Sequence, residues 1–126
     1  MTAVPDTFEF QNSEVGRISA EGDRLNIRLS AAQVHWRGVS GFLSGVEITC
    51  TGASWHGELH HSQGALGEGH LLIDGVRLRN VPLSFAQDGG VVLTLDFKNE
   101  SSLTVHARQV AVHPEQAARF TESLAC

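Results

Sequence analysis

The sequence has 126 residues, of which 41% are hydrophobic, and its 14 acidic and 9 basic residues give a formal net charge of −5. This length predicts a single domain over residues 1–126, and the apolar fraction excludes a disordered chain. The basic residues are scattered and no apolar run reaches about 20 residues, so we expect neither a nucleic acid nor a membrane as a partner. The first ten residues lack the pattern of a secretory signal, which predicts a cytoplasmic protein.

Alternation of apolar and polar residues predicts that most of the first half is β-strand. Residues 7–11 form a short alternating run, residues 15–20 form a second short run, and a turn at 21–23 leads into a longer alternating run at 24–34. A further run at 46–51 has the same period of two, which places its apolar side chains on one face. These runs are typical of half-buried strands with one face toward water.

Glycine interrupts the pattern in the middle of the chain, and alternation returns toward the end. Residues 35–45 predict a loop or a bulged connection, and residues 52–69 are the least regular part of the sequence. Alternation is clear again at 91–98. Pro82 interrupts the run 76–85, which predicts an edge strand or a break, because proline cannot donate a hydrogen bond to a strand ladder.

One α-helix is predicted at the C-terminal end, at about residues 114–124. Pro114 suits a first helical turn, and Glu115 complements the positive end of a helix. An apolar stripe at helical spacing would dock this helix on the sheet or across one end of a barrel. The residues of that stripe are Ala117, Phe120 and Leu124.

Together these elements predict an all-β fold, an antiparallel barrel-like or sandwich domain of about seven to nine strands with one C-terminal helix. The hairpin patterns of the second half include Asp74-Gly75-Val76, Val81-Pro82-Leu83 and the run 90–95. In these patterns the chain resembles small bacterial all-β proteins that carry no assigned function. The resemblance covers under half of the chain, and it implies an all-β single domain and no activity.

Histidine is the unusual residue type, since four of the seven lie within residues 55–71. In an extended chain His56, Glu58 and His60 would share one face, with about 6.5–7 Å between successive members. Imidazole and carboxylate groups at that spacing can converge on one ion, with His70 from a neighbouring strand as a fourth ligand. This set predicts a site for a divalent transition metal such as Zn²⁺, Fe²⁺, Mn²⁺ or Ni²⁺. The competing interpretation is a solvent-exposed hairpin face that binds no cofactor.

The two tryptophans are the other candidates for a site. Trp36 and Trp55 both fall in the irregular, glycine-rich half of the chain. They could line the mouth of a ligand cavity, because such cavities have apolar walls with a few polar groups. The alternative is that both side chains cap the core.

The preferred functional hypothesis is a non-catalytic module that binds a protein partner or a small ligand. The sequence has no phosphate-binding loop, no cofactor fingerprint and no nucleophile signature. Unpaired strand edges also favour a homodimer. Two alternatives stay open, namely a small metal-dependent enzyme or metal sensor that uses the His/Glu cluster at 56–70, and a carrier of a small apolar ligand.

Overall fold

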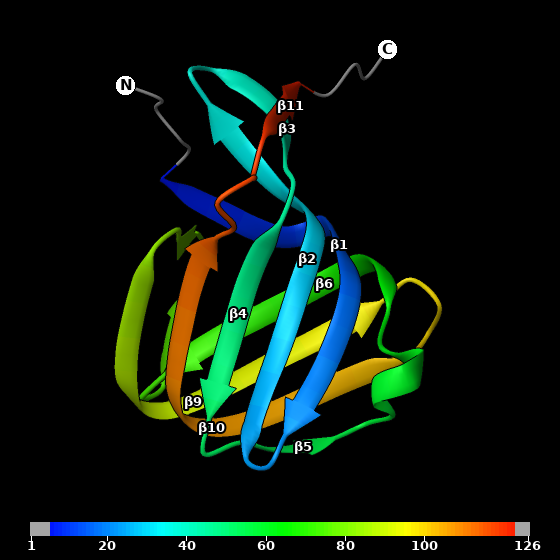
Figure 1. The fold of residues 1–126 in the computed structure, drawn as a ribbon, viewed down its shortest axis with the longest axis vertical. Helices are drawn as coiled ribbons and strands as arrows, with labels where there is room; N and C mark the ends of the chain where they lie inside the picture. The colour runs from blue at the N-terminus through cyan, green and yellow to red at the C-terminus, as the bar shows by residue number, and fades with distance from the viewer. Residues whose placement is uncertain (1–5, 123–126) are drawn as a thin grey trace.

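The computed structural model describes residues 6–122, and this part of the chain is built almost entirely of β-strands (Figure 1). The strands are β1 (Thr7–Glu21), β2 (Arg24–Trp36), β3 (Val39–Leu43), β4 (Val46–Thr51), β5 (Ser54–His56), β6 (Gly64–Ile73), β7 (Val76–Leu78), β8 (Val81–Pro82), β9 (Phe85–Phe97), β10 (Ser102–Pro114) and β11 (Phe120–Glu122). One 3₁₀ turn, η1, spans Leu59–His61. Over residues 6–122 no helix has the length and the apolar character needed to cross a membrane.

Six of the strands form a closed antiparallel barrel. Neighbours pair around the ring in the order β1, β2, β4, β10, β9 and β6, and β6 pairs again with β1. The all-β prediction and the antiparallel barrel are therefore confirmed. The described residues hold eleven strands, more than the expected seven to nine, because segments without clear alternation, such as 39–43 and the glycine-rich 64–69, also pair.

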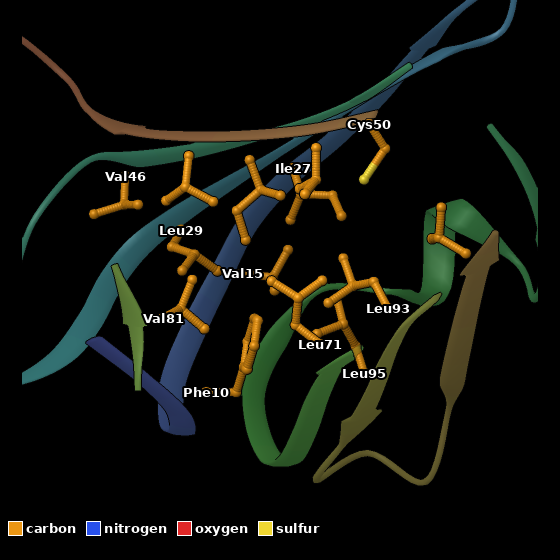
Figure 2. Close-up of a cluster of buried hydrophobic side chains, with 14 of the residues drawn as sticks. Phe10, Val15, Ile27, Leu29, Val46, Cys50, Leu71, Val81, Leu93 and Leu95 are labelled. Carbon is orange, nitrogen blue, oxygen red and sulfur yellow. The ribbon is translucent and has the colours of Figure 1, made fainter. Parts of the chain in front are cut away.

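The barrel interior is filled by the inward side chains of the alternating strands. In β2 the side chains of Leu25, Ile27 and Leu29 are fully buried, and the polar residues between them face outward. Figure 2 shows such side chains meeting between the wall made by β2 and β4 and the wall made by β6 and β9. Burial of one aliphatic side chain stabilises a fold by about 1.5–3 kcal/mol, so this interior is the main source of stability.

β2 continues past the barrel and forms a smaller sheet with β3 and β11, which stands above the barrel in Figure 1. Arg37 and Gly38 have φ values of 54° and 76°, the left-handed values that a tight hairpin of this kind requires. The loop expected over 35–45 is therefore a two-stranded hairpin. Trp36 packs edge-on against Phe120 of β11, with 5.0 Å between ring centroids, which fastens β11 to the hairpin.

The predicted helix at 114–124 is wrong. Pro114 ends β10, where it pairs with Val46 of β4, and the chain then turns and enters β11. So short a helix is marginal by itself, because isolated helices of fewer than about 12–15 residues are barely stable in water. Pairing with the edge of β3 instead gives this segment backbone hydrogen bonds and a packing site for Phe120. The last two residues of the predicted helix lie outside the described range.

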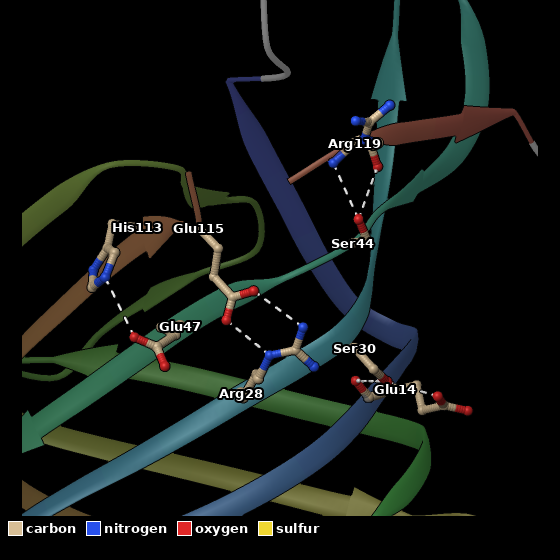
Figure 3. Close-up of polar contacts among 8 residues, drawn as sticks. All are labelled: Glu14, Arg28, Ser30, Ser44, Glu47, His113, Glu115 and Arg119. Atoms are coloured by element: carbon tan, nitrogen blue, oxygen red, sulfur yellow. Dashed lines mark hydrogen bonds and ion pairs between the residues drawn. The ribbon is translucent and has the colours of Figure 1, made fainter. Parts of the chain in front are cut away.

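A bidentate ion pair ties the segment after β10 to the barrel wall (Figure 3). Arg28 of β2 donates from Nε to one carboxylate oxygen of Glu115 at 2.8 Å and from Nη2 to the other at 3.1 Å. The hydrogen bond from Arg28 lowers the pKa of Glu115 below its ordinary value. The two side chains are 36% and 29% exposed, so solvent screens the pair and its contribution to stability is modest.

We expect Glu115→Gln to lower the free energy of unfolding by at most about 1 kcal/mol at neutral pH, because a partly exposed ion pair is lost. A carboxylate whose pKa is lowered by folding stabilises the fold above its unfolded pKa of about 4.3. That contribution disappears as the pH falls through the lower folded pKa. Urea unfolding followed from neutral to acidic pH should show the variant and the natural protein converging below about pH 4.

The matched control is Asp23→Asn, which removes a 3.9 Å contact with Arg108 between side chains that are 64% and 84% exposed. We expect no measurable change in that variant. A difference between Glu115→Gln and the natural protein that persists in acid would contradict the assignment of the effect to this ion pair.

Candidate functional site

The ladder between β1 and β6 is interrupted, and this interruption defines the candidate site. The two strands pair at only two positions, Glu14 with Ala65 and Val15 with Gly64. Farther along, the free edge of β6 pairs with β7, and the beginning of β1 pairs with β8. A gap in the barrel wall therefore lies between these pairings.

A bulge in β1 produces the gap. β1 takes several more residues than β2 between the register pairs Glu9↔Gln33 and Glu14↔Ala31. Ser13, which is fully buried, holds the bulge in place. Its hydroxyl donates to the Glu9 carbonyl at 2.5 Å and accepts the backbone N–H of Gln33 at 2.8 Å. Bulges that turn a strand away from its partner are common next to binding sites.

An open hollow of about 220 Å³ lies over the gap and is lined by residues from β1, β6 and the β7 region. Its apolar part is formed by Phe10, Gly69 and Leu78, and its polar part by Glu9, Gln11, Glu68, Arg77 and Arg79. We call these eight residues the β1–β6 hollow. It combines apolar contacts with four ionisable groups of both signs, as small-ligand sites do.

A glycine allows β1 and β6 to approach each other beneath the hollow. A Cβ atom built on Gly69 would stand 2.6 Å from the Cβ of Phe10 and 2.7 Å from its Cγ. Atoms do not pack so closely, so residue 69 must lack a side chain for Phe10 to occupy its buried position. Phe10 in turn packs edge-on against Phe8, with 5.2 Å between ring centroids. The hollow therefore has a firmly packed apolar base.

In the hollow each glutamate lies near a histidine, whereas the two arginines have no ion-pair partner among residues 6–122. Glu9 lies 3.7 Å from Nε2 of His35, and Glu68 lies 3.5 Å from Nε2 of His70. Among residues 6–122, Arg77 and Arg79 form no ion pair. A guanidinium group offers several donors in a planar fork, which suits a carboxylate or phosphate group. Two such groups without a carboxylate partner are available to a ligand.

The structure separates two of the predicted metal ligands. The two histidines lie at the ends of a row of four neighbouring strands. His56 of β5 pairs with Thr104 of β10, Thr104 pairs with Thr94 of β9, and Thr94 pairs with His70 of β6. Three strand spacings of about 4.8 Å each put roughly 14 Å between the backbones of the two histidines. They do not approach a common ion.

Only one pair of the proposed ligand set is in contact. Nδ1 of His60 lies 3.4 Å from a carboxylate oxygen of Glu58, and both side chains are largely exposed. The rings of His60 and His61 in η1 are tilted by 56° to each other, with 4.1 Å between their centroids. Within the described part of the chain no three His, Cys, Asp or Glu residues are grouped so that they could hold a metal ion. Metal binding by the cluster stays a prediction.

The tryptophans lie away from the hollow. Trp36 packs on Phe120 and carries the guanidinium of Arg37 at 4.6 Å from its ring centroid, and Trp55 of β5 packs against the core. Neither side chain lines the β1–β6 hollow or a second surface hollow, of about 300 Å³. The residues lining the second hollow are Gly16, Arg17 and Arg28.

Ser40 of β3, His35 of β2 and Glu9 of β1 form a row across three neighbouring strands. Oγ of Ser40 is 3.0 Å from Nδ1 of His35, and Nε2 of His35 is 3.7 Å from Glu9. The second distance is too long for a hydrogen bond, and the histidine side chain is 57% exposed. A base that is neither oriented nor shielded from water does not activate a hydroxyl well, so we assign no nucleophilic role to Ser40.

Cys50 is also unsuited to catalysis. It is fully buried on the inner face of β4, and burial raises the pKa of its thiol to about 12. The thiolate is the reactive form of cysteine, and it is essentially absent at neutral pH at such a site. Cys50 therefore acts as a small core residue.

Sequence reasoning missed the charged residues of the hollow, Glu9, Glu68, Arg77 and Arg79. A signal was present, because the alternating pattern of β1 breaks between the runs 7–11 and 15–20. Such a break predicts a bulge. It does not reveal that β6 and β7 lie beside it, since that requires the pairing of strands distant in the sequence.

Comparison of the chain with models of protein families, with curated proteins and with solved structures finds no match.

Proposed function

We propose that this protein is a non-catalytic binding module that holds a small charged organic molecule in the β1–β6 hollow. The observation that carries the proposal is the interruption of the barrel wall beside β1, which opens a hollow lined by two arginines and two glutamates. The barrel interior, by contrast, is filled with packed side chains. The hollow supplies polar groups for orientation and an apolar base for contact.

Two further features support binding without chemistry. The nucleophile candidates are a buried, protonated thiol at Cys50 and an exposed hydroxyl at Ser40 without an oriented base. The hollow is lined by residues of β1, β6 and β7, whose backbone positions are set by strand pairing, and by Arg79 directly after β7. Charges that complement those of a ligand favour its binding and its selection.

The test is a thermal-unfolding screen with small carboxylates, phosphates and amino acids, all of which carry an anionic group that the two arginines can bind. A ligand that binds only the folded protein raises the free energy of unfolding by about 2.7 kcal/mol when its concentration is 100 times its Kd. We expect at least one of these classes to raise the melting temperature of the natural protein. We expect the double variant Arg77→Ala/Arg79→Ala to lose that increase.

The control is Arg24→Ala/Arg108→Ala, which removes two exposed arginines outside the hollow and keeps the same net charge as the test variant. This control should keep the ligand-induced increase in full. The proposal is wrong if no class raises the melting temperature, or if the increase survives in the test variant.

Two further expectations from the sequence belong to this proposal. We place the protein in the cytoplasm, and we propose that it self-associates through a strand edge. β11 supports the second point, because within residues 6–122 it pairs only with β3 and so leaves its other edge open.

A further inference from the structure

The charges of the β1–β6 hollow come from separate strands and do not neutralise one another by contact. Arg77 and Arg79 belong to β7 and the residue after it, whereas Glu9 is on β1 and Glu68 is on β6. No ion pair within 4.0 Å joins either arginine to either glutamate in the described structure. Opposite charges therefore line one hollow with space between them.

The backbone places the two kinds of charge on different strands. The bulge of β1 lies directly after Glu9, and pairing of β7 with β6 sets Arg77 opposite Leu72. Phe10 is buried beneath, against Gly69. The arginines and the glutamates therefore reach the hollow from separate backbone positions.

From this separation we infer that the ligand of the hollow is a zwitterion. Its anionic group would bind the guanidinium groups of Arg77 and Arg79, and its cationic group would bind the carboxylates of Glu9 and Glu68. A ligand with a single charge meets one attractive pair and one repulsive pair at the same site. A zwitterion meets two attractive pairs, so it binds more tightly than either of its halves.

The apolar base of the hollow adds to this chemistry. Leu78, which is partly buried, lines the hollow together with Gly69 and the buried Phe10, so a short hydrocarbon part of the ligand can contact apolar atoms between the two charged ends. Amino acids are the simplest molecules with a carboxylate, an ammonium group and such a hydrocarbon part. The inference rests on the proposed function, since it names the chemical class of ligand for that same hollow.

The experiment compares two matched sets of probes by titration calorimetry at low salt. The first set is leucine, isocaproate and isoamylamine, and the second is ε-aminocaproate, caproate and hexylamine. Each set holds a zwitterion, the same molecule without its ammonium group and the same molecule without its carboxylate, and the two sets differ in the distance between the charges. All six probes are titrated in one buffer at one pH, so the comparison within each set depends only on the group that was removed.

We expect the better zwitterion to bind at least about tenfold more tightly than either single-charge analogue of its set. The variant Arg77→Ala/Arg79→Ala should remove its advantage over the amine, and Glu9→Gln/Glu68→Gln should remove its advantage over the carboxylate. All four substituted side chains lie on the outer surface, and melting temperatures of the free variants check that the fold is kept.

Equal binding of a zwitterion and its carboxylate analogue would overturn the inference and leave the proposed function standing, with a simple anion as ligand. The same holds if a phosphate or another class from the thermal screen binds at the arginines while neither zwitterion does. Failure of every class in the screen would overturn both the inference and the proposed function.

Discussion

Leu93→Ala should lower the free energy of unfolding by about 2–5 kcal/mol, the usual cost of truncating a fully buried leucine. Leu93 lies at the centre of the barrel wall on β9, opposite Leu71 of β6 and Val105 of β10. All three side chains are essentially inaccessible to solvent. Urea unfolding followed by circular dichroism measures the change. This loss would be a large part of the protein's stability, because the total free energy of unfolding of a domain is typically about 5–15 kcal/mol.

The control is Val76→Ala, which shortens an apolar side chain that is 63% exposed on β7. That variant should stay within about 0.5 kcal/mol of the natural protein. The comparison also tests the alternative of an apolar-ligand carrier. A leucine that lined an empty chamber would lose few contacts on truncation, so a cost near that of Val76→Ala would contradict the packed interior and favour the carrier.

The strands could be predicted from the sequence where one face is buried and the other is wet. The runs at 46–51 and 91–98 keep one buried face throughout. The run at 24–34 does so up to Leu29, after which its buried positions shift by one residue to Ala32 and Val34; each run lies in a strand of the barrel. Period-two burial depends only on residues close in the sequence. Alternation along one strand does not state which strands are neighbours, so closure of the barrel through β1 and β2 could not be predicted.

The wrongly predicted C-terminal helix shows where a local pattern is not sufficient. Ala117, Phe120 and Leu124 have helical spacing, but three apolar residues in so short a segment are weak support for a helix. The decisive partner is β3, which lies far away in the sequence and was expected to be a loop. Once Arg37 and Gly38 turn the chain into a hairpin, the edge of β3 is available and Phe120 can pack against Trp36.

The candidate site could not be predicted for the same reason. The sequence predicts a metal site because four histidines lie close together along the chain. The strand register nevertheless puts His56 and His70 at the two ends of a row of four strands. The hollow brings Glu9 of β1 together with Glu68 and Arg77 of the hairpin β6–β7, which lies far from β1 in the sequence. In a barrel whose strands pair over long distances in the sequence, residues that are close in the sequence need not be close in space.

Gly69→Ala should lower the free energy of unfolding by about 1–3 kcal/mol, the usual cost of overpacking a filled site. The added methyl group would stand 2.6 Å from the Cβ of Phe10, whose side chain is only 3% exposed and is held by Phe8. Phe10 or the β6 backbone must therefore move. Because both residues form the base of the hollow, ligand affinity should fall together with stability, and urea unfolding and calorimetry measure the two effects.

Gly67→Ala is the matched control on the same strand. A Cβ atom there would be 3.7 Å from the Asp96 carbonyl oxygen and 3.8 Å from Cγ of Lys98, which are ordinary contact distances. Both variants reduce the flexibility of the unfolded chain in the same way, an effect of about 0.4–1 kcal/mol that favours folding. The difference between them therefore isolates the clash with Phe10. Equal stability of the two variants would show that Gly69 is not needed for the close approach of β1 and β6, and the hollow would then lack the fixed base on which its ligand selectivity depends.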